Sequence, residues 1–270
     1  MIIKTEQEVD CISYDYKGNL VYGCYHHENN IREGIICFNI EKEIFIKTSG
    51  TFNIIHHNNL LYAANVSDIT IYNNNNNIHS ISTQQMNTSI DIAHGIISVS
   101  QSNGFLCIYD ENLNKIHESN LSNDILWTTR MMDRVILVGG EDEHLYMIDS
   151  KSNTKIKEIN RSGVVTSMLY EDYLLYVGSY DEHVNIYDIR NYKLLKRIKI
   201  GGGVWKITKL GDGFILACMY EGVKVYDKDW KMIKNYKTES IAYGLSVHGN
   251  QIAFSSFYDK IMHIEEWNHS

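Results

Sequence analysis

The chain of 270 residues contains no proline and only five cysteines, and it has no long apolar run. We attribute the missing proline to the coding composition of the genome rather than to mechanism. The cysteines are odd in number and none belongs to a C-x-x-C pair, which argues against a disulfide scaffold and against zinc. No uncharged apolar stretch approaches the roughly 18 residues of a membrane helix, and the acidic start MIIKTEQEVD is unlike a signal or transit peptide. These absences predict a cytoplasmic protein that does not enter membranes.

Basic clusters and the common hydrolase motifs are also missing. The net charge is −8 and no block of Lys and Arg occurs, so we expect no nucleic-acid partner, although one basic protein surface remains compatible. No G-x-S-x-G is present, which excludes the nucleophile elbow of an α/β-hydrolase. No H-E-x-x-H or comparable ligand spacing is present either, so we expect no metal and no cofactor.

What the sequence does contain is a repeat of about 39 residues. Seven segments place an acidic or amide residue after an apolar, strand-like run, and these residues are Asn39, Asn73, Asp110, Asp149, Asp188, Asp227 and Glu266. The successive spacings are 34, 37, 39, 39, 39 and 39 residues. Each unit has an apolar run, a short polar turn, an alternating strand rich in Val, Ile and Tyr, and a looser segment with a further strand. Units of about 40 residues with four short strands are typical of β-propeller blades.

Seven units predict an all-β, seven-bladed propeller that occupies residues 1–270 as one domain. Such a ring must close, because a free sheet edge invites aggregation. The last unit ends near Trp267 and leaves no room for its outer strand, whereas the first residues are β-formers that precede the first unit. We therefore predict that Ile2–Lys4 complete the seventh blade. A closed propeller needs no partner for stability, so we expect a monomer.

The polar turn of the fifth unit carries a more specific signal. GSYDEHVNIYD resembles the WD-repeat pattern, with Tyr187 where that family usually has Trp, and VGGEDEH repeats the turn 39 residues upstream. In that family the Asp of this turn, here Asp181 and Asp142, is commonly structural. Beside it, GGGVWKI, LACMYEGVKV and SSFYDKIMHIEEW, with YG at Tyr243–Gly244, resemble the diphthine methyl ester hydrolases, which are WD-repeat enzymes.

This resemblance covers roughly Val138 to Trp267, while the first three units match only as generic blades. A long insertion that many relatives carry before the last blade is missing, and Lys260 replaces a frequent His. The resemblance implies a cytosolic enzyme that removes the methyl ester from a modified histidine of translation elongation factor 2. That factor, carrying methylated diphthine, is the implied partner, and the free carboxylate is then amidated to diphthamide.

Ester cleavage needs an activated nucleophile, a proton shuttle and donors for the oxyanion. In WD-repeat topology the quoted stretches converge at one mouth of the central channel, the usual setting of a site. His183 and His144 are the candidate bases, because each follows an acid by two residues, Asp181 and Asp142, and imidazole titrates near neutral pH. The alternative is that both histidines pack against the adjacent blade. Backbone N–H groups of Gly202 and Gly203 are candidate oxyanion donors, with a plain turn as the alternative.

The implied substrate also carries a quaternary trimethylammonium group. Aromatic faces with a nearby carboxylate recognise such cations. The candidate aromatic residues are Tyr180, Trp205 and Tyr258, and the candidate carboxylates are Asp181, Asp259 and Glu141. Core packing is the alternative for the aromatic residues, above all for Trp205, which follows the glycines into a predicted inner strand.

Two other functions fit the same residues. A non-catalytic WD-repeat adaptor agrees with the acidic surface and with the lack of a standard catalytic motif, since most propellers are binding platforms. A reader would hold the cationic side chain of the modified histidine without reacting. The sequence does not decide which group attacks the ester.

Overall fold

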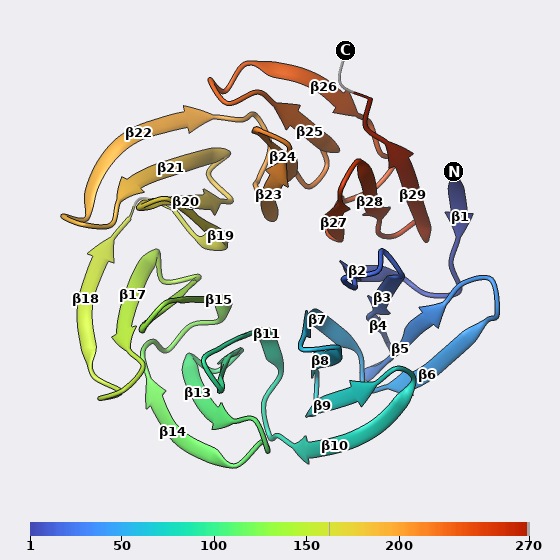
Figure 1. Cartoon of the computed structure of the whole chain (residues 1–270), viewed down its shortest axis with the longest axis horizontal. Coiled ribbons are helices and arrows are strands. Elements are labelled where there is room, and N and C mark those ends of the chain that lie inside the picture. Colours follow the sequence, from blue (N-terminus) through green and yellow to red (C-terminus); the bar gives the residue numbers. More distant parts are fainter. Residues whose placement is uncertain (162, 269–270) are drawn as a thin grey trace.

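Seven β-sheets stand side by side in a ring around a central axis in the computed structural model of the protein (Figure 1). The structure describes residues 1–161 and 163–268, and every regular element within those ranges is a strand. The second to sixth sheets are each built from four consecutive antiparallel strands, with the first of the four next to the axis. The predicted all-β, seven-bladed propeller is therefore confirmed.

The second to sixth blades contain the following strands, from the axis outward. The second has β7 (Thr51–His57), β8 (Leu60–Asn65), β9 (Asp68–Asn73) and β10 (Asn76–Ser82). The third has β11 (Asn87–Ala93), β12 (Ile96–Gln101), β13 (Phe105–Asp110) and β14 (Lys115–Asn120). The fourth has β15 (Leu126–Met132), β16 (Val135–Gly140), β17 (His144–Asp149) and β18 (Lys155–Asn160). The fifth has β19 (Val165–Glu171), β20 (Leu174–Ser179), β21 (His183–Asp188) and β22 (Lys193–Lys199). The sixth has β23 (Lys206–Leu210), β24 (Gly213–Ala217), β25 (Val223–Tyr226) and β26 (Met232–Tyr236).

The first blade departs from this plan by one short strand. It contains β2 (Val9–Tyr14), β3 (Leu20–Cys24), β5 (Ile31–Asn39) and β6 (Ile44–Thr48). An extra strand, β4 (His26–Glu28), folds back on the start of β5. The intervening turn has positive φ at Asn29 and Asn30, a conformation that asparagine tolerates better than most residues.

The seventh blade joins the two ends of the chain. Its strands β27 (Leu245–His248), β28 (Gln251–Ser256) and β29 (Ile261–Glu266) are completed by β1 (Ile2–Lys4), which is antiparallel to β29 (Figure 1). Ile3 pairs with Met262, and the Thr5 N–H donates to the Lys260 carbonyl at 2.8 Å. The predicted closure by the N-terminal strand is thus confirmed.

The acidic residue that marks each repeat forms a turn. Six of the seven marker residues end a third strand as predicted, and Asp227 directly follows the last residue of β25. Oδ1 of Asp110 accepts from the N–H groups of Asn112 and Asn114, at 2.9 and 2.8 Å. Asp227 does the same two and four residues downstream. These carboxylates pair backbone groups of the turn to the outer strand, which explains why an acid or amide recurs there.

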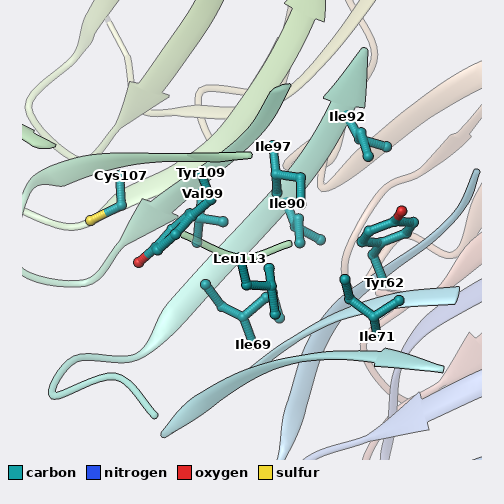
Figure 2. Close-up of a cluster of buried hydrophobic side chains, with 11 residues drawn as sticks. Tyr62, Ile69, Ile71, Ile90, Ile92, Ile97, Val99, Cys107, Tyr109 and Leu113 are labelled. Atoms are coloured by element: carbon teal, nitrogen blue, oxygen red, sulfur yellow. The ribbon is translucent and has the colours of Figure 1, made fainter. Parts of the chain in front are cut away.

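The hydrophobic core lies between neighbouring blades. Alternate residues of a buried strand point to opposite neighbours, so Leu145 and Met147 pack toward the fifth blade while Tyr146 and Ile148 pack toward the third. Apolar clusters of this kind follow one another around the whole ring. Figure 2 shows the one between the second and third blades, where Tyr62, Ile69 and Ile71 face Ile90, Ile97 and Tyr109. Central strands buried on both faces explain the nearly continuous apolar runs in the sequence.

Two adjacent residues of β1 test the closure. Ile3 packs against the cluster between the seventh and first blades, whereas Ile2 is 68% exposed. We expect Ile3→Asp to lower the free energy of unfolding by roughly 2 kcal/mol, because it removes a partly buried apolar side chain and places a charge there. Ile2→Asp, the matched control, should change it by less than about 0.5 kcal/mol. Equal urea midpoints for the two variants would contradict the closure by β1.

Candidate functional site

One end of the propeller collects the turns that the sequence singled out. In each four-stranded meander, the turn between the second and third strands lies at the same end as the loop that enters the next inner strand. The turns at Tyr180–Glu182 and Cys218–Gly222, the turn at Phe257–Lys260 and the loop at Ile200–Trp205 therefore share one face. We call this the upper face.

Six aromatic residues meet on the upper face, and we call them the aromatic cluster. They are Trp127, Tyr180, Trp205, Tyr243, Phe257 and Tyr258. Trp205 is central, with ring centroids 5.4 Å from Trp127, 5.8 Å from Tyr180 and 4.7 Å from Tyr243. Phe257 lies 5.1 Å from Tyr243 and carries the contact on to Tyr258, which is 65% exposed. The cluster thus joins residues from the fourth to the seventh blades.

A carboxylate is fixed at the edge of this cluster. The Trp127 indole N–H donates to Oε1 of Glu141 at 2.5 Å. Glu141 begins the turn after β16, and its charge raises the pKa of Tyr180, which burial has already raised, to about 12. The carboxylate is therefore held close to aromatic faces, the arrangement that binds organic cations.

Below the cluster the inner strands surround a cavity of about 420 Å³. Its upper part is lined by Trp127, Trp205 and Tyr243 of the cluster, together with Asp10 of β2 and Lys206 of β23. All five lie within two residues of the start of an inner strand. The cavity and the cluster are thus parts of one site, in which the ionisable side chains of Asp10 and Lys206 lie beneath the aromatic cluster.

Asp10 and Lys206 carry unusual electrostatics. Asp10 is 7% exposed, and burial raises the pKa of its carboxyl to about 8, against the smaller opposing effect of Lys206. Burial likewise lowers the pKa of the Lys206 ammonium to about 8, with Arg130 acting in the same direction. Perturbed groups of opposite kind in one cavity are characteristic of functional sites.

The two candidate histidines sit in their turns in the same way. Nδ1 of His183 lies 2.6 Å from the Asp181 carbonyl, and Nδ1 of His144 lies 2.6 Å from the Asp142 carbonyl. The His144 ring stacks on Tyr146, and its Nε2 is 3.4 Å from Glu158 on the outer strand β18. Both histidines start the third strand of their blade, whereas Asp10 and Lys206 lie on the innermost strands.

The two aspartates of these turns hold the turns together. Asp181 accepts from the His183 N–H at 3.1 Å and from the Arg197 guanidinium at 2.9 Å. Asp142 accepts from the His144 N–H at 3.1 Å and from the Tyr146 hydroxyl at 2.6 Å. Each carboxylate uses one oxygen for backbone and the other for a side chain.

The glycines of the loop before β23 permit close packing. A side chain at Gly202 would meet the Cys218 carbonyl at 2.8 Å, and one at Gly203 would meet the Met219 sulfur at 2.7 Å. Gly202 also has a φ of 142°, which favours glycine. Neither residue's N–H makes a hydrogen bond with the part of the chain that the structure describes. These N–H groups are therefore not committed to hydrogen bonds within the described chain, although Gly202 is buried.

Other singled-out residues lie around the same face. Oδ1 of Asp259 is buried and makes no hydrogen bond to any described residue. The neighbouring Lys260 ammonium lies 3.6 Å from Glu8, which ties the turn after β28 to the first blade. Burial raises the pKa of the Cys218 thiol to about 12, so this cysteine stays protonated.

Sequence reasoning brought part of this site together and missed the rest. It named Tyr180, Trp205, Tyr258 and Glu141, all of which belong to the cluster or border it. It named none of Asp10, Trp127, Lys206 and Tyr243 as a candidate site residue. Their position in the repeat could have identified them, because each of these four residues lies within two residues of the start of an inner strand.

Within residues 1–161 and 163–268, no three His, Cys, Asp or Glu side chains are grouped to hold a metal ion. The same residues form no helix long and apolar enough to cross a membrane.

Comparison with known proteins shows the fold. No protein-family model and no curated protein matches this sequence. Among solved structures, a chain of the "Crystal Structure of Mitotic Checkpoint Complex" is similar to it with a TM-score of 0.83 and 9% sequence identity. The match covers 99% of this chain and 91% of that chain. The protein therefore has the fold of a WD-repeat propeller.

The raised pKa of Asp10 predicts a dependence of stability on pH. The unfolded carboxyl ionises near its usual value of 3.8, whereas the folded one keeps its proton up to about pH 8. Between these values the folded state binds more protons, so its stability falls as pH rises. Asp10→Asn removes this loss, and we expect its advantage over the wild type to grow by up to about 1 kcal/mol per pH unit between pH 5 and 7. Urea unfolding at each pH measures it.

A matched control is Asp229→Asn, whose side chain is exposed in the turn after β25. Its difference from the wild type should stay constant over the same range. A constant difference for Asp10→Asn as well would show that Asp10 ionises normally in the folded protein.

Proposed function

We propose that this protein is a methylesterase that hydrolyses the methyl ester of diphthine on translation elongation factor 2. The observation that carries the proposal is the aromatic cluster with its fixed Glu141 carboxylate at the mouth of the channel cavity. A trimethylammonium group is apolar on its surface and cannot donate a hydrogen bond, so aromatic faces and a nearby negative charge suit it. The motif resemblance between Val138 and Trp267 supports the same substrate.

The chemistry of the substrate limits where the base acts. In diphthine the ester carbonyl is attached to the carbon that carries the trimethylammonium group, so both must lie within a few ångströms of each other. With the cation against Trp205 and Tyr243, the ester carbon falls at the top of the cavity. This favours a base inside the cavity over His183 and His144, which hold their turns on the third strands of the blades. Gly202 and Gly203 are the candidate oxyanion donors from backbone.

A non-catalytic adaptor is the second candidate. Tyr220 and Tyr258 are 68% and 65% exposed on upper-face turns, and exposed aromatic residues are enriched in protein interfaces. The similar fold in the mitotic checkpoint complex also belongs to a multiprotein assembly. An adaptor would bind the elongation factor through this face without releasing methanol.

Mass spectrometry of the methylated elongation factor separates these functions. We expect the purified protein to convert the ester to the acid, and His183→Ala to do so at a similar rate. Loss of conversion in a folded His183→Ala would restore that histidine as the base. An intact ester after incubation with the folded wild type, alongside measurable binding, would favour the adaptor or the reader.

Substitution of Trp205 tests whether its aromatic face binds the cation. We expect Trp205→Ala to weaken binding of the methylated factor about 10-fold or more, since a desolvated cation–aromatic contact contributes about 2 kcal/mol. Tyr16→Ala is the control, because Tyr16 is 64% exposed in the turn after β2, at the opposite end of the propeller. Equal dissociation constants for the two variants would argue against the cluster as the cation site.

Substitution of Glu141 tests whether its negative charge contributes to binding of the cation. Glu141→Gln keeps an oxygen for the Trp127 indole and removes only the negative charge. We expect affinity for tetramethylammonium to fall about 5-fold, equivalent to about 1 kcal/mol. Glu143→Gln, two residues away in the same turn and exposed, should leave it unchanged. Titration calorimetry of both variants makes the comparison, and an unaltered affinity in Glu141→Gln would remove this carboxylate from the site.

A further inference from the structure

Four ionisable side chains on inner strands form two groups with different surroundings. Asp91 of β11 and Arg130 of β15 are paired at 3.5 Å, and Asp91 also accepts from the Met131 N–H at 2.7 Å. Asp10 and Lys206 have no such partners. Neither side chain makes a hydrogen bond or direct ion pair with any residue of the described ranges 1–161 and 163–268.

Such an arrangement is costly for a folded protein. A buried ionisable side chain without a hydrogen-bond partner loses its hydration, and it either keeps an uncompensated charge or gives the charge up, as Asp10 does near neutral pH. Asp10 is nine-tenths buried, yet its carboxyl lines the cavity together with Lys206. Structural charges are normally paired as Asp91 and Arg130 are. An acid and a base that face one cavity without partners are instead available to interact with polar or charged groups of a bound ligand.

The position of the pair relates it to the aromatic cluster. Lys206 directly follows Trp205, the central ring of the cluster. Asp10 and Lys206 line the same cavity as Trp205 and Tyr243 of the cluster. The charge of Asp10 also contributes to the raised pKa values of both Tyr180 and Tyr243. A ligand whose cation occupies the cluster would therefore present its adjacent atoms to Asp10 and Lys206.

We propose that Asp10 is the general base that activates water for ester hydrolysis, and that Lys206 stabilises the oxyanion. This assignment rests on the proposed methylesterase function and names the residues that would perform its chemical step. Both groups would touch the reacting atoms, Asp10 through the attacking water and Lys206 through the carbonyl oxygen.

The step balances without any further reactant. Water attacks the ester carbonyl carbon as its proton passes to the Asp10 carboxylate, and the carbonyl oxygen becomes an oxyanion beside the Lys206 ammonium. The intermediate collapses, the bond to the methoxy group breaks, and the proton on Asp10 passes to the departing oxygen to give methanol. The product acid then ionises and leaves as a carboxylate.

The substrate itself supplies a condition for this role. Burial keeps the Asp10 carboxyl protonated in the free protein near neutral pH. A trimethylammonium group bound in the cluster would place a permanent positive charge close by, which favours the carboxylate form. The base would therefore form where a cationic ester is bound, and uncharged esters would be poor substrates.

The test compares Asp10→Asn, Lys206→Met and the control Asp229→Asn with the wild type on methylated elongation factor 2. We expect Asp10→Asn to lower kcat by a factor of about 10² to 10⁴ and Lys206→Met by about 10² to 10³, with KM little changed. Asp229→Asn should match the wild type. Thermal unfolding establishes that each variant is folded.

Single turnover in water enriched in ¹⁸O distinguishes the role of Asp10. A general base predicts the label in the new carboxylate of the elongation factor. Label in Asp10 and none in the product would make it a nucleophile and overturn the assignment.

The failures of the two proposals are distinguishable. Turnover by the wild type together with near-normal kcat in Asp10→Asn would overturn this inference and leave the methylesterase intact. A rise in KM at constant kcat would also overturn it, because it would make Asp10 a binding residue only. No turnover by the folded wild type would overturn both.

Discussion

Packing between adjacent blades is the interaction on which the rest of the structure depends. No blade has a core of its own, because each sheet buries its two faces against its two neighbours. A ring built in this way is stable only when it is complete, since an open ring would expose two apolar sheet faces. The antiparallel pairing of β1 with β29 completes the last sheet that the ring needs. Closure therefore protects every blade, including those far from it in the sequence.

The same geometry creates the candidate site. A closed ring brings the starts of seven inner strands to one axis, and side chains at those positions come from residues 10 to 243. The apolar contacts between blades lie farther from the axis. The positions at the strand starts can therefore hold side chains that contribute nothing to the core. Asp10 and Lys206 occupy them at an energetic cost, while Asp91 and Arg130 neutralise each other. Whether an ionisable side chain has a partner therefore distinguishes structural residues from candidate catalytic residues more clearly than residue type does.

The acid-rich turns around Asp142 and Asp181 have a structural role. Asp142 and Asp181 each bind a backbone N–H and a second side chain, and the histidines two residues later bind carbonyls of the same turns. A repeat that must turn in every blade selects such self-contained polar networks. The residues that differ between blades, such as Tyr180 and Glu141, are the ones that border the mouth. Function in a repeat fold is therefore best sought in departures from the repeat.

The sequence by itself determined the number of blades, the ends of their third strands and the closing strand. These follow from local rules, namely alternation of apolar residues, turn chemistry and a repeat spacing of 34 to 39 residues. It also identified Tyr180, Trp205, Tyr258 and Glu141 as candidates. Only the tertiary structure revealed that Asp10 and Lys206 face one cavity, and that Trp127 and Tyr243 complete the cluster around Trp205. These residues are separated by up to 233 positions. Their proximity results from ring closure, and the absence of hydrogen-bond partners for a buried ionisable side chain is a property of three-dimensional packing that no local pattern encodes.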